Sequence, residues 1–235
     1  QSSERKETGF GDFVSVEGLV KDGEYFPLAM TGRLKTVPPF TELGNIAPCI
    51  LSADKKAKIV DLVSRAINAL KLENCATHTE LKLKANGEVS FLETSARMGG
   101  VAIALELQDV FGFDYTDLYL RLMLSEPVAI PAFEENPPTG AAASVALIGC
   151  TSDGTAWSHD RIFEPNKPDW GKLIDTEGSV KVVYAQSISP GSKFGKYDYN
   201  SGVLNYAGQA YLQTADSRTI KDAAYRLIDG LEQEL

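Results

Sequence analysis

An Asn-Gly pair at positions 86 and 87 restricts the fold of this chain more than any other feature. It is the strongest short signal for a β-hairpin, because a two-residue type I′ turn needs positive φ at both positions and these residues tolerate it. Such a turn pairs Ala85 with Glu88 and, further along the strands, Glu80 with Glu93. Opposed Cβ atoms lie about 4.5–5.5 Å apart, and like charges at that distance are destabilising. The hairpin therefore predicts that two carboxylates meet directly.

Side chains alternate between the two faces of a strand, so the other residues of HTELKLKANGEVSFLETSARMGG (78–100) can be assigned to a face. The face of the two glutamates also receives three polar residues: His78, Ser95 and Arg97. The opposite face receives three leucines, which we expect to supply contacts with the core: Leu81, Leu83 and Leu92. For His78 we expect a structural or supporting role rather than that of a base.

Two opposed carboxylates form an oxygen-rich site for Mg²⁺, which takes one or two protein carboxylates and completes its shell with phosphate oxygens and water. The cation cancels the repulsion within the pair. Arg97 carries a planar fork that suits a phosphate or acyl-phosphate, and the Gly99-Gly100 pair that follows allows close approach of the backbone. The alternative is an ordinary exposed face, on which the glutamates pair with Lys82 and Arg97.

Strands and helices are predicted around this hairpin. FVSVEGLV (13–20) and YFPLAMT (25–31) predict a second hairpin with a turn at Lys21-Asp22-Gly23. The segment VPPFTELGNIAPC is rich in Pro and Gly and is predicted to be a loop. The helical spacing of apolar residues predicts a helix at about 52–72, and two more helices are expected at about 101–111 and 115–124.

A change in composition marks a domain boundary near residue 135. IPAFEENPPTG (130–140) holds three prolines and has the composition of a linker. After it come three short strand candidates and an amphipathic helix: 142–149, 179–187, 207–214 and 216–231. We therefore expect one domain over residues 1–135 and a small α+β domain over residues 136–235.

Charge and composition exclude several classes of protein. The 235 residues are 43% hydrophobic and carry a net charge of −9, with a pI of about 4.8. An acidic chain without basic clusters is not expected to bind nucleic acid. No apolar run approaches the ~18 residues of a membrane span, and no signal peptide is visible. Three scattered cysteines, Cys49, Cys75 and Cys150, predict free thiols in a reducing compartment and hence a cytoplasmic protein.

Segment 78–100 resembles the metal-binding signature of ATP-grasp enzymes. In that signature an acidic residue, a hairpin and an E-x-N-x-R-like motif hold the Mg²⁺ ions that bridge the phosphates of ATP. The resemblance implies that Glu80 and Glu93 are metal ligands and that Arg97 is the catalytic arginine. Ser95 falls where many members have a metal-ligating Asn, and its hydroxyl is a poorer ligand, which weakens a second metal site.

The pattern TE…ETSAR.GG is most similar to the branch that contains the L-amino-acid ligases. VSVEGLVKDGEYFPLAMTGR (14–33) resembles the strand pair beside the nucleotide in the same family. The resemblance implies that Glu17 contributes to the nucleotide site, the alternative being an ordinary strand residue. Arg33 and Lys35 lead into the Pro-rich loop. Both could reach a phosphate or carboxylate, with a solvated basic pair as the alternative, and Lys35 is the one that we assign to the nucleotide site.

The resemblance implies an ATP-dependent carboxylate–amine ligase that forms an acyl-phosphate, uses ATP with Mg²⁺ or Mn²⁺, and acts on small-molecule carboxylates and amines. The implied fold is α+β: the second half of an ATP-grasp domain, an antiparallel sheet with helices, followed by a small α+β C-terminal domain. The N-terminal domain and the lysine-bearing first half of such enzymes do not fit before Phe13. We therefore expect the C-terminal portion of a ligase of roughly twice this length, acting with the missing half.

Two alternatives to this ligase stay open. One is a biotin-carboxylase-like enzyme, in which bicarbonate is the activated acid. The other is a non-catalytic module, an ATP-grasp half kept for assembly or nucleotide sensing. A homodimer is compatible with each of them.

Overall fold

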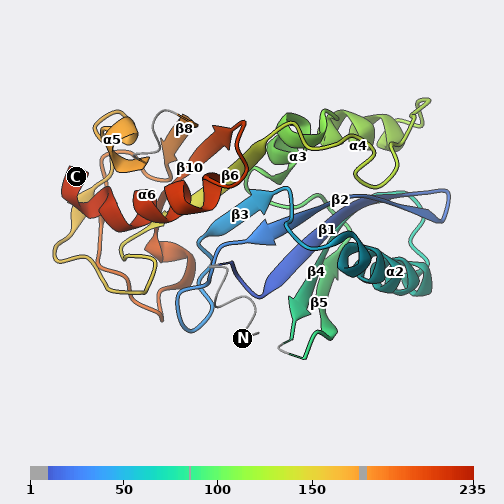
Figure 1. The fold of residues 1–235 in the computed structure, drawn as a ribbon, viewed down its shortest axis with the longest axis horizontal. Helices are drawn as coiled ribbons and strands as arrows, with labels where there is room; N and C mark the ends of the chain where they lie inside the picture. Colours follow the sequence, from blue (N-terminus) through green and yellow to red (C-terminus); the bar gives the residue numbers. More distant parts are fainter. Residues whose placement is uncertain (1–9, 85, 175–178) are drawn as a thin grey trace. The chain divides into compact units, whose positions relative to one another are not determined.

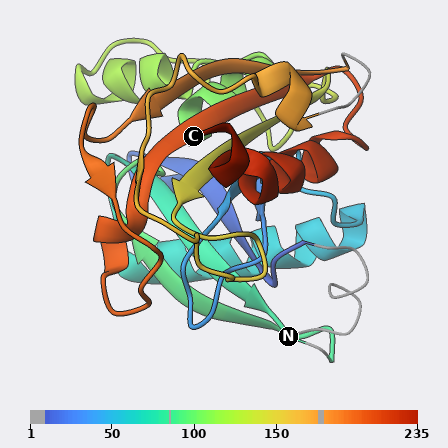
Figure 2. The same ribbon diagram turned by 90° about the vertical axis from the view of Figure 1, so that its left-hand side faces the viewer.

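The computed structural model describes residues 10–84, 86–174 and 179–235 (Figure 1 and Figure 2). Two compact units make up this part of the chain. The first is formed by Asp12–Gly32 and Ala47–Thr139, and the second mainly by Arg33–Ile46 and Gly140–Leu235. Each unit combines β-strands with helices, which confirms the predicted α+β class. The domain boundary near residue 135 stays a prediction. None of the helices in the described ranges is long and apolar enough to cross a membrane.

The first unit contains four strands in the order β5-β4-β1-β2, and each pair of neighbours is antiparallel. Their bounds are β1 (Phe13–Lys21), β2 (Glu24–Arg33), β4 (Cys75–Leu83) and β5 (Val89–Ser95). Asp22 and Gly23 join β1 to β2 with φ of 51° and 81°. Positive φ at both turn positions is the requirement of a type I′ turn, so the hairpin predicted at this point is confirmed.

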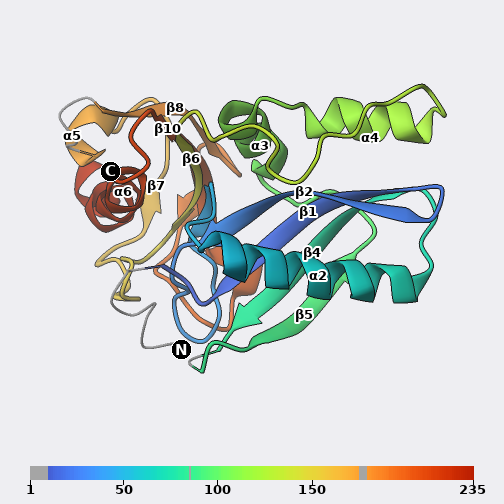
Figure 3. The same cartoon turned by 45° about the vertical axis from the view of Figure 1, so that its right-hand side comes forward.

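Helices lie on both sides of these strands (Figure 3). On one side, α2 (Ala53–Leu70) buries Ile59, Val63 and Ile67, which recur every fourth residue and pack with inward-facing strand residues such as Val14 and Val16. On the other side lie α3 (Ile103–Phe111) and α4 (Tyr115–Met123). Asp114 caps α4, because its side chain accepts a hydrogen bond from the Asp117 N–H. The three helices expected in this part of the chain are therefore confirmed.

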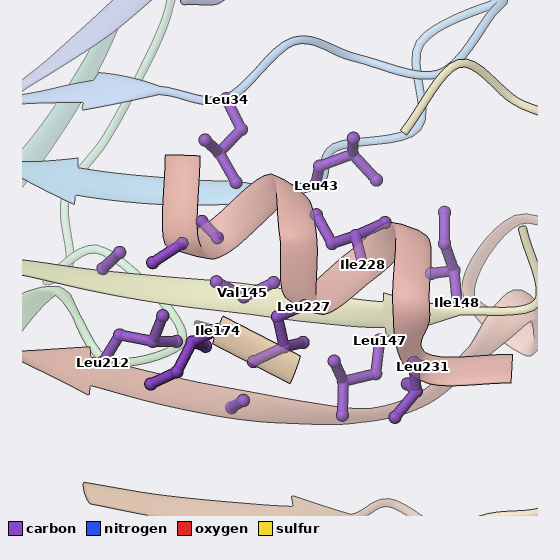
Figure 4. Packing of buried hydrophobic residues seen from close by; sticks show 14 of the residues in the cluster. Leu34, Leu43, Val145, Leu147, Ile148, Ile174, Leu212, Leu227, Ile228 and Leu231 are labelled. Atoms are coloured by element: carbon purple, nitrogen blue, oxygen red, sulfur yellow. The ribbon is translucent and has the colours of Figure 1, made fainter. Parts of the chain in front are cut away.

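The second unit contains strands in the order β3-β6-β10-β8, covered on one face by α5 and α6. The bounds are β3 (Gly44–Ala47), β6 (Ala141–Ile148), β8 (Val180–Ser187), β10 (Tyr206–Thr214), α5 (Trp170–Ile174) and α6 (Ile220–Glu234). Leu227, Ile228 and Leu231 of α6 pack over Leu147 and Leu212 (Figure 4). Smaller elements complete the unit: β7 (Arg161–Ile162), β9 (Lys193–Phe194) and the 3₁₀ helix η1 (Gly202–Asn205).

One predicted loop contains a strand. VPPFTELGNIAPC was expected to be irregular throughout, but it includes β3, with Asn45, Ile46 and Ala47 buried. Gly44 makes this possible: its φ is +148°, and a Cβ built on it would lie 2.0 Å from the backbone oxygen of Ser144. A glycine inside a strand often marks such a close approach of two backbones.

Gly44→Ala should therefore destabilise the second unit strongly. We expect the free energy of unfolding to fall by about 2–4 kcal/mol, because the new methyl group meets backbone and the φ is unfavourable. Gly191→Ala is the matched control, since Gly191 also has positive φ but nothing lies within 4 Å of its Cβ position. The control should lose only about 1–2 kcal/mol. Urea denaturation of both variants measures the difference, and equal losses would contradict the packing argument.

Candidate active site

Two rows of polar side chains cross one face of the first unit's strands. Residues directly opposite each other on neighbouring strands point to the same face. From β2 through β1 and β4 to β5, the first row is Thr31, Ser15, Glu80 and Glu93. The second row is Ala29, Glu17, His78 and Ser95. Because α2 covers the other face, these rows form a polar layer that is separate from the apolar core beneath α2.

The structure places Glu80 directly opposite Glu93, as the sequence predicts, but the loop between the two strands differs from the predicted turn. The Lys84 N–H donates to the Glu88 oxygen over 2.9 Å, and the Gly87 N–H donates to the Lys84 oxygen over 3.1 Å. The loop between the strands is therefore one residue longer than a type I′ turn. Glu88 is bonded to Lys84, and the expected pair of Ala85 with Glu88 lies outside the described residues, because Ala85 is not among them.

A bulge at Leu92 restores the predicted register. Leu81 lies opposite Phe91 and Glu80 lies opposite Glu93, so Leu92 has no partner across the strands. The expected core contact of Leu92 is therefore wrong, and its side chain is 50% exposed, whereas Leu81 and Leu83 are buried as predicted. The extra loop residue and the bulge shift the register in opposite senses, which is why the glutamates still meet.

A continuous chain of hydrogen-bonded side chains connects the two rows. Thr31 Oγ1 lies 2.7 Å from Ser15 Oγ, and Ser15 Oγ donates to Glu17 Oε1 over 2.9 Å. His78 Nδ1 lies 2.7 Å from the same Glu17 oxygen, and His78 Nε2 lies 3.2 Å from Glu80 Oε1. Ser15, Glu17 and Thr31 are fully buried. The chain thus leads from the interior of the first unit to the Glu80 carboxylate.

Exposure rises along the same path. The side chain of His78 is 6% exposed and that of Glu80 is 18% exposed, while Glu93 on the outer strand is exposed. The interpretation as an ordinary exposed face expected Lys82 to pair with the glutamates. Instead, Lys82 Nζ lies 2.6 Å from Asp12 Oδ1. The two opposed carboxylates therefore form a pair that is held on the Glu80 side and open to solvent on the Glu93 side.

The segment after β5 carries Arg97 and approaches the buried carboxylate. β5 ends at Ser95, so strand alternation does not assign a face to Arg97, and its expected position on the face of the glutamates stays a prediction. Arg97 is exposed, and its Nη1 donates to the Met98 oxygen over 2.9 Å. In the ranges that the structure describes, Arg97 and Glu93 form no ion pair with each other. The guanidinium is therefore available to a ligand at this end of the strands.

Gly99 fits tightly against the polar rows. Its N–H donates to Glu17 Oε2 over 3.3 Å. A Cβ at this position would lie 2.8 Å from His78 Nδ1 and 2.9 Å from Glu17 Oε2, so only glycine leaves room for both side chains. The sequence analysis anticipated a close approach at Gly99-Gly100, but toward a ligand; the structure shows an approach to the protein's own Glu17 and His78.

The three residues assigned to the nucleotide lie in different settings. Glu17 is fully buried, with both carboxylate oxygens hydrogen-bonded. Ser95 is half-buried opposite His78. Lys35 is exposed and belongs to the second unit, where its backbone N–H donates to Tyr225 Oη over 2.9 Å. Contacts of these residues with a nucleotide stay a prediction.

Ser15, Thr31 and Tyr115 support the site and were missed from the sequence. The alternation of Ser15 and Glu17 between buried valines is a signal that could have revealed a polar face. Tyr115 donates to the Gly18 and Thr77 oxygens over 2.9 and 3.2 Å. Burial raises the pKa of Tyr115 well above its usual value and the Glu17 carboxylate raises it further, so the hydroxyl keeps its proton and donates to both strands.

Comparison with known proteins connects this geometry to a group of ligases. No family profile matches the chain. Alanine–anticapsin ligase from Bacillus subtilis is 42% identical over 116 residues, which are 49% of this chain and 24% of that protein. The crystal structure of L-amino acid ligase from Bacillus licheniformis matches 95% of this chain with a TM-score of 0.69 and 23% identity. Biotin carboxylase from Campylobacter jejuni matches 87% of the chain with a TM-score of 0.57 and 16% identity.

The predicted resemblance to ATP-grasp ligases is confirmed. The described fold, antiparallel strands with helices, agrees with the fold class that this resemblance implies. The chain spans about half the length of the L-amino acid ligase, 53%, and 42% of the biotin carboxylase.

The donor set of the site suits the metal that ATP-grasp ligases use. Carboxylate oxygens are the ligands that Mg²⁺ and Mn²⁺ prefer, and Glu80 and Glu93 supply them from opposed positions. Among the described residues, no group of three or more His, Cys, Asp or Glu side chains is arranged to hold a metal ion. A pair of carboxylates would suit a cation that takes its remaining ligands from phosphate and water.

Proposed function

We propose that this chain is the metal- and ATP-binding portion of an ATP-dependent carboxylate–amine ligase. The observation that carries the proposal is the direct opposition of Glu80 and Glu93 beside the Arg97–Gly100 segment, on a chain related to alanine–anticapsin ligase. The repulsion between two carboxylates destabilises the hairpin unless a cation or another positive group lies between them. An ATP-dependent ligase provides a reason to keep both.

The proposal gives each site residue a role. Glu80 and Glu93 would hold Mg²⁺ or Mn²⁺, which when bound neutralises phosphate charge during phosphoryl transfer. Arg97 would orient the transferred phosphoryl group with its planar fork. Ser95, half-buried opposite His78, is a candidate for a weak contact with the nucleotide or its metal. The carboxylate substrate is converted to an acyl-phosphate, which a small-molecule amine attacks with release of phosphate.

The substrates and the rest of the enzyme are part of the proposal. The relatives are ligases for amino acids by name, which favours an amino-acid carboxylate and amine over bicarbonate. The biotin-carboxylase alternative is supported only by fold similarity at 16% identity. Because the chain spans about half of the L-amino acid ligase, we propose that it acts with the remaining part of that fold. A homodimer and a cytoplasmic location stay predictions.

The test is turnover by the complete ligase. We expect release of ADP and phosphate that depends on both a carboxylate and an amine, with amino-acid pairs as the first substrates, and a condensed product by mass spectrometry. Turnover that requires bicarbonate instead would favour the biotin-carboxylase alternative. ATP binding without turnover for any acid–amine pair would favour the non-catalytic module.

The isolated 235-residue chain should bind MgATP weakly. Without the rest of the ligase fold, much of the nucleotide stays in water, and binding depends on burial and on convergent polar contacts. We expect a Kd on the order of 1 mM or weaker, equivalent to only ~4 kcal/mol, and no ligase activity. Isothermal titration calorimetry measures the affinity. A micromolar Kd would show that the chain contains a complete nucleotide site.

A further inference from the structure

We propose that Glu17 is a positioning residue, which ties the Glu80 carboxylate, through His78, to the 96–100 segment that carries Arg97. The inference deepens the proposed function: it explains how a metal ligand and the phosphate-binding arginine keep a fixed separation. It departs from the expectation that Glu17 contacts the nucleotide directly. The evidence is the burial of Glu17 and the identity of the groups around it.

Glu17 is surrounded by groups from three parts of the first unit. Its Oε1 accepts from Ser15 Oγ within β1 and lies 2.7 Å from His78 Nδ1 of β4. Its Oε2 accepts from the Gly99 N–H in the segment after β5. With 0% exposure, the carboxylate has no surface to offer a ligand. A buried carboxylate is costly unless its oxygens are hydrogen-bonded, and here both oxygens are used to connect protein segments.

His78 links Glu17 to the Glu80–Glu93 carboxylate pair. The imidazole lies between two carboxylates, with Nδ1 at Glu17 and Nε2 3.2 Å from Glu80 Oε1. The His78 side chain is 6% exposed, so the ring cannot turn away without leaving a buried nitrogen unsatisfied. The Glu80 carboxylate is thereby held at the inner side of the pair, while Glu93 on the outer strand has no such constraint.

Gly99 closes the connection on the arginine side. The absence of a side chain lets its backbone contact both Glu17 and His78, since a Cβ would lie within 2.9 Å of each. Arg97 is two residues earlier in the same segment. Without the Glu17 contacts, the Glu80 carboxylate and the Arg97 backbone could shift independently of each other, and a phosphoryl-transfer site depends on a fixed placement of its groups.

The test compares two measurements on the 235-residue chain. Glu17→Gln keeps the shape but replaces one accepting oxygen by an NH₂ donor, so either the Gly99 N–H loses its acceptor or the contacts to Ser15 and His78 must reverse their donor direction. We expect the Gly99 amide to exchange faster with solvent in the metal-free chain, measured by NMR. We also expect the Kd for Mn²⁺ alone, from water-proton relaxation, to rise about tenfold or more, as for other partners of metal ligands.

Three further variants make the result interpretable. Glu134→Gln is the control, because Glu134 is a largely buried carboxylate that pairs with Lys56 of α2, on the opposite side of the strands; it should change neither measurement. His78→Gln, whose amide reaches the position of Nε2, should retain more Mn²⁺ affinity than His78→Ala. These two variants test the same connection if Glu17→Gln does not fold, and equal losses in both would overturn the role of His78.

Failure of this inference differs from failure of the proposed function. Glu93→Gln should weaken Mn²⁺ binding if the carboxylate pair is the metal site. If it does so while Glu17→Gln and the His78 variants leave Mn²⁺ affinity and Gly99 exchange unchanged, the positioning role is wrong and the metal site stands. If Glu93→Gln has no effect on Mn²⁺ binding, the metal site is wrong. Faster Gly99 exchange in Glu17→Gln would still support the connection between β1, β4 and the Arg97 segment.

Discussion

Glu93→Gln should abolish metal-dependent ATP turnover in the complete ligase and leave the fold intact. The substitution removes one of the two carboxylates of the proposed metal site, and the neutral amide is a much weaker ligand for Mg²⁺. Glu93 is exposed, and it lies directly opposite Glu80. Removing its charge relieves a like-charge contact, so in the absence of metal the free energy of unfolding should rise by a few tenths of a kcal/mol, about 0.2–1 kcal/mol.

The opposite signs of the two effects make this prediction specific. A residue needed for folding loses activity and stability together, whereas Glu93→Gln should lose activity and keep or gain stability. Glu88→Gln is the matched control, since Glu88 lies in the same hairpin, is exposed and forms an ion pair across the loop with Lys84. Phosphate release and urea denaturation measure both quantities. Normal turnover by Glu93→Gln, or an equal loss in Glu88→Gln, would contradict the metal role.

The hairpin shows how much of the site the sequence could predict. Alternation and an Asn-Gly signal placed Glu80 opposite Glu93, and the structure has them there. The loop length and the bulge at Leu92 could not be predicted, because both depend on how β5 adjusts to β4 and on the cost of burying particular side chains. The predicted register agrees with the structure because the longer loop and the bulge shift it by one residue in opposite senses.

The contacts of Glu17 could not be predicted from local sequence patterns. The contacts of Glu17 join residues 61 and 82 positions away in the chain, His78 and Gly99. Such contacts follow from the order of the strands, which no local periodicity specifies. For the same reason β3 was missed: a four-residue strand next to prolines has too few residues for a pattern, and its place depends on the close approach of Gly44 to Ser144.

Elements with a strong local signal were predicted well. The helix at Ala53–Leu70 has a regular apolar stripe, and the Asp22-Gly23 turn satisfies its φ requirement locally. Both depend on neighbours within a few residues, which the sequence displays directly. The contrast with Glu17 indicates that, in this chain, the scaffold can be predicted from local rules, while the support of the site depends on strand order.

Arg97→Lys should lower kcat of the complete ligase by about tenfold or more, equivalent to ~1.4 kcal/mol of transition-state stabilisation. Lysine keeps the positive charge but offers a single ammonium in place of a planar fork, so two parallel hydrogen bonds to a phosphoryl group become one. Arg97 is exposed and bonded only to the neighbouring Met98 oxygen in the described structure. The free energy of unfolding should therefore change by no more than about 0.5 kcal/mol.

The distinction between kcat and KM identifies the step that Arg97 serves. If the guanidinium fork acts on the phosphoryl group during transfer, kcat falls while KM for ATP changes little. A higher KM for ATP at unchanged kcat would assign Arg97 to nucleotide binding alone. Arg121→Lys is the control, because Arg121 is an exposed arginine of α4 whose guanidinium pairs with Asp117. Steady-state kinetics and thermal denaturation of both variants decide the question. An unchanged kcat with a lower Tm in Arg97→Lys would show that the arginine holds the segment after β5 rather than the phosphate.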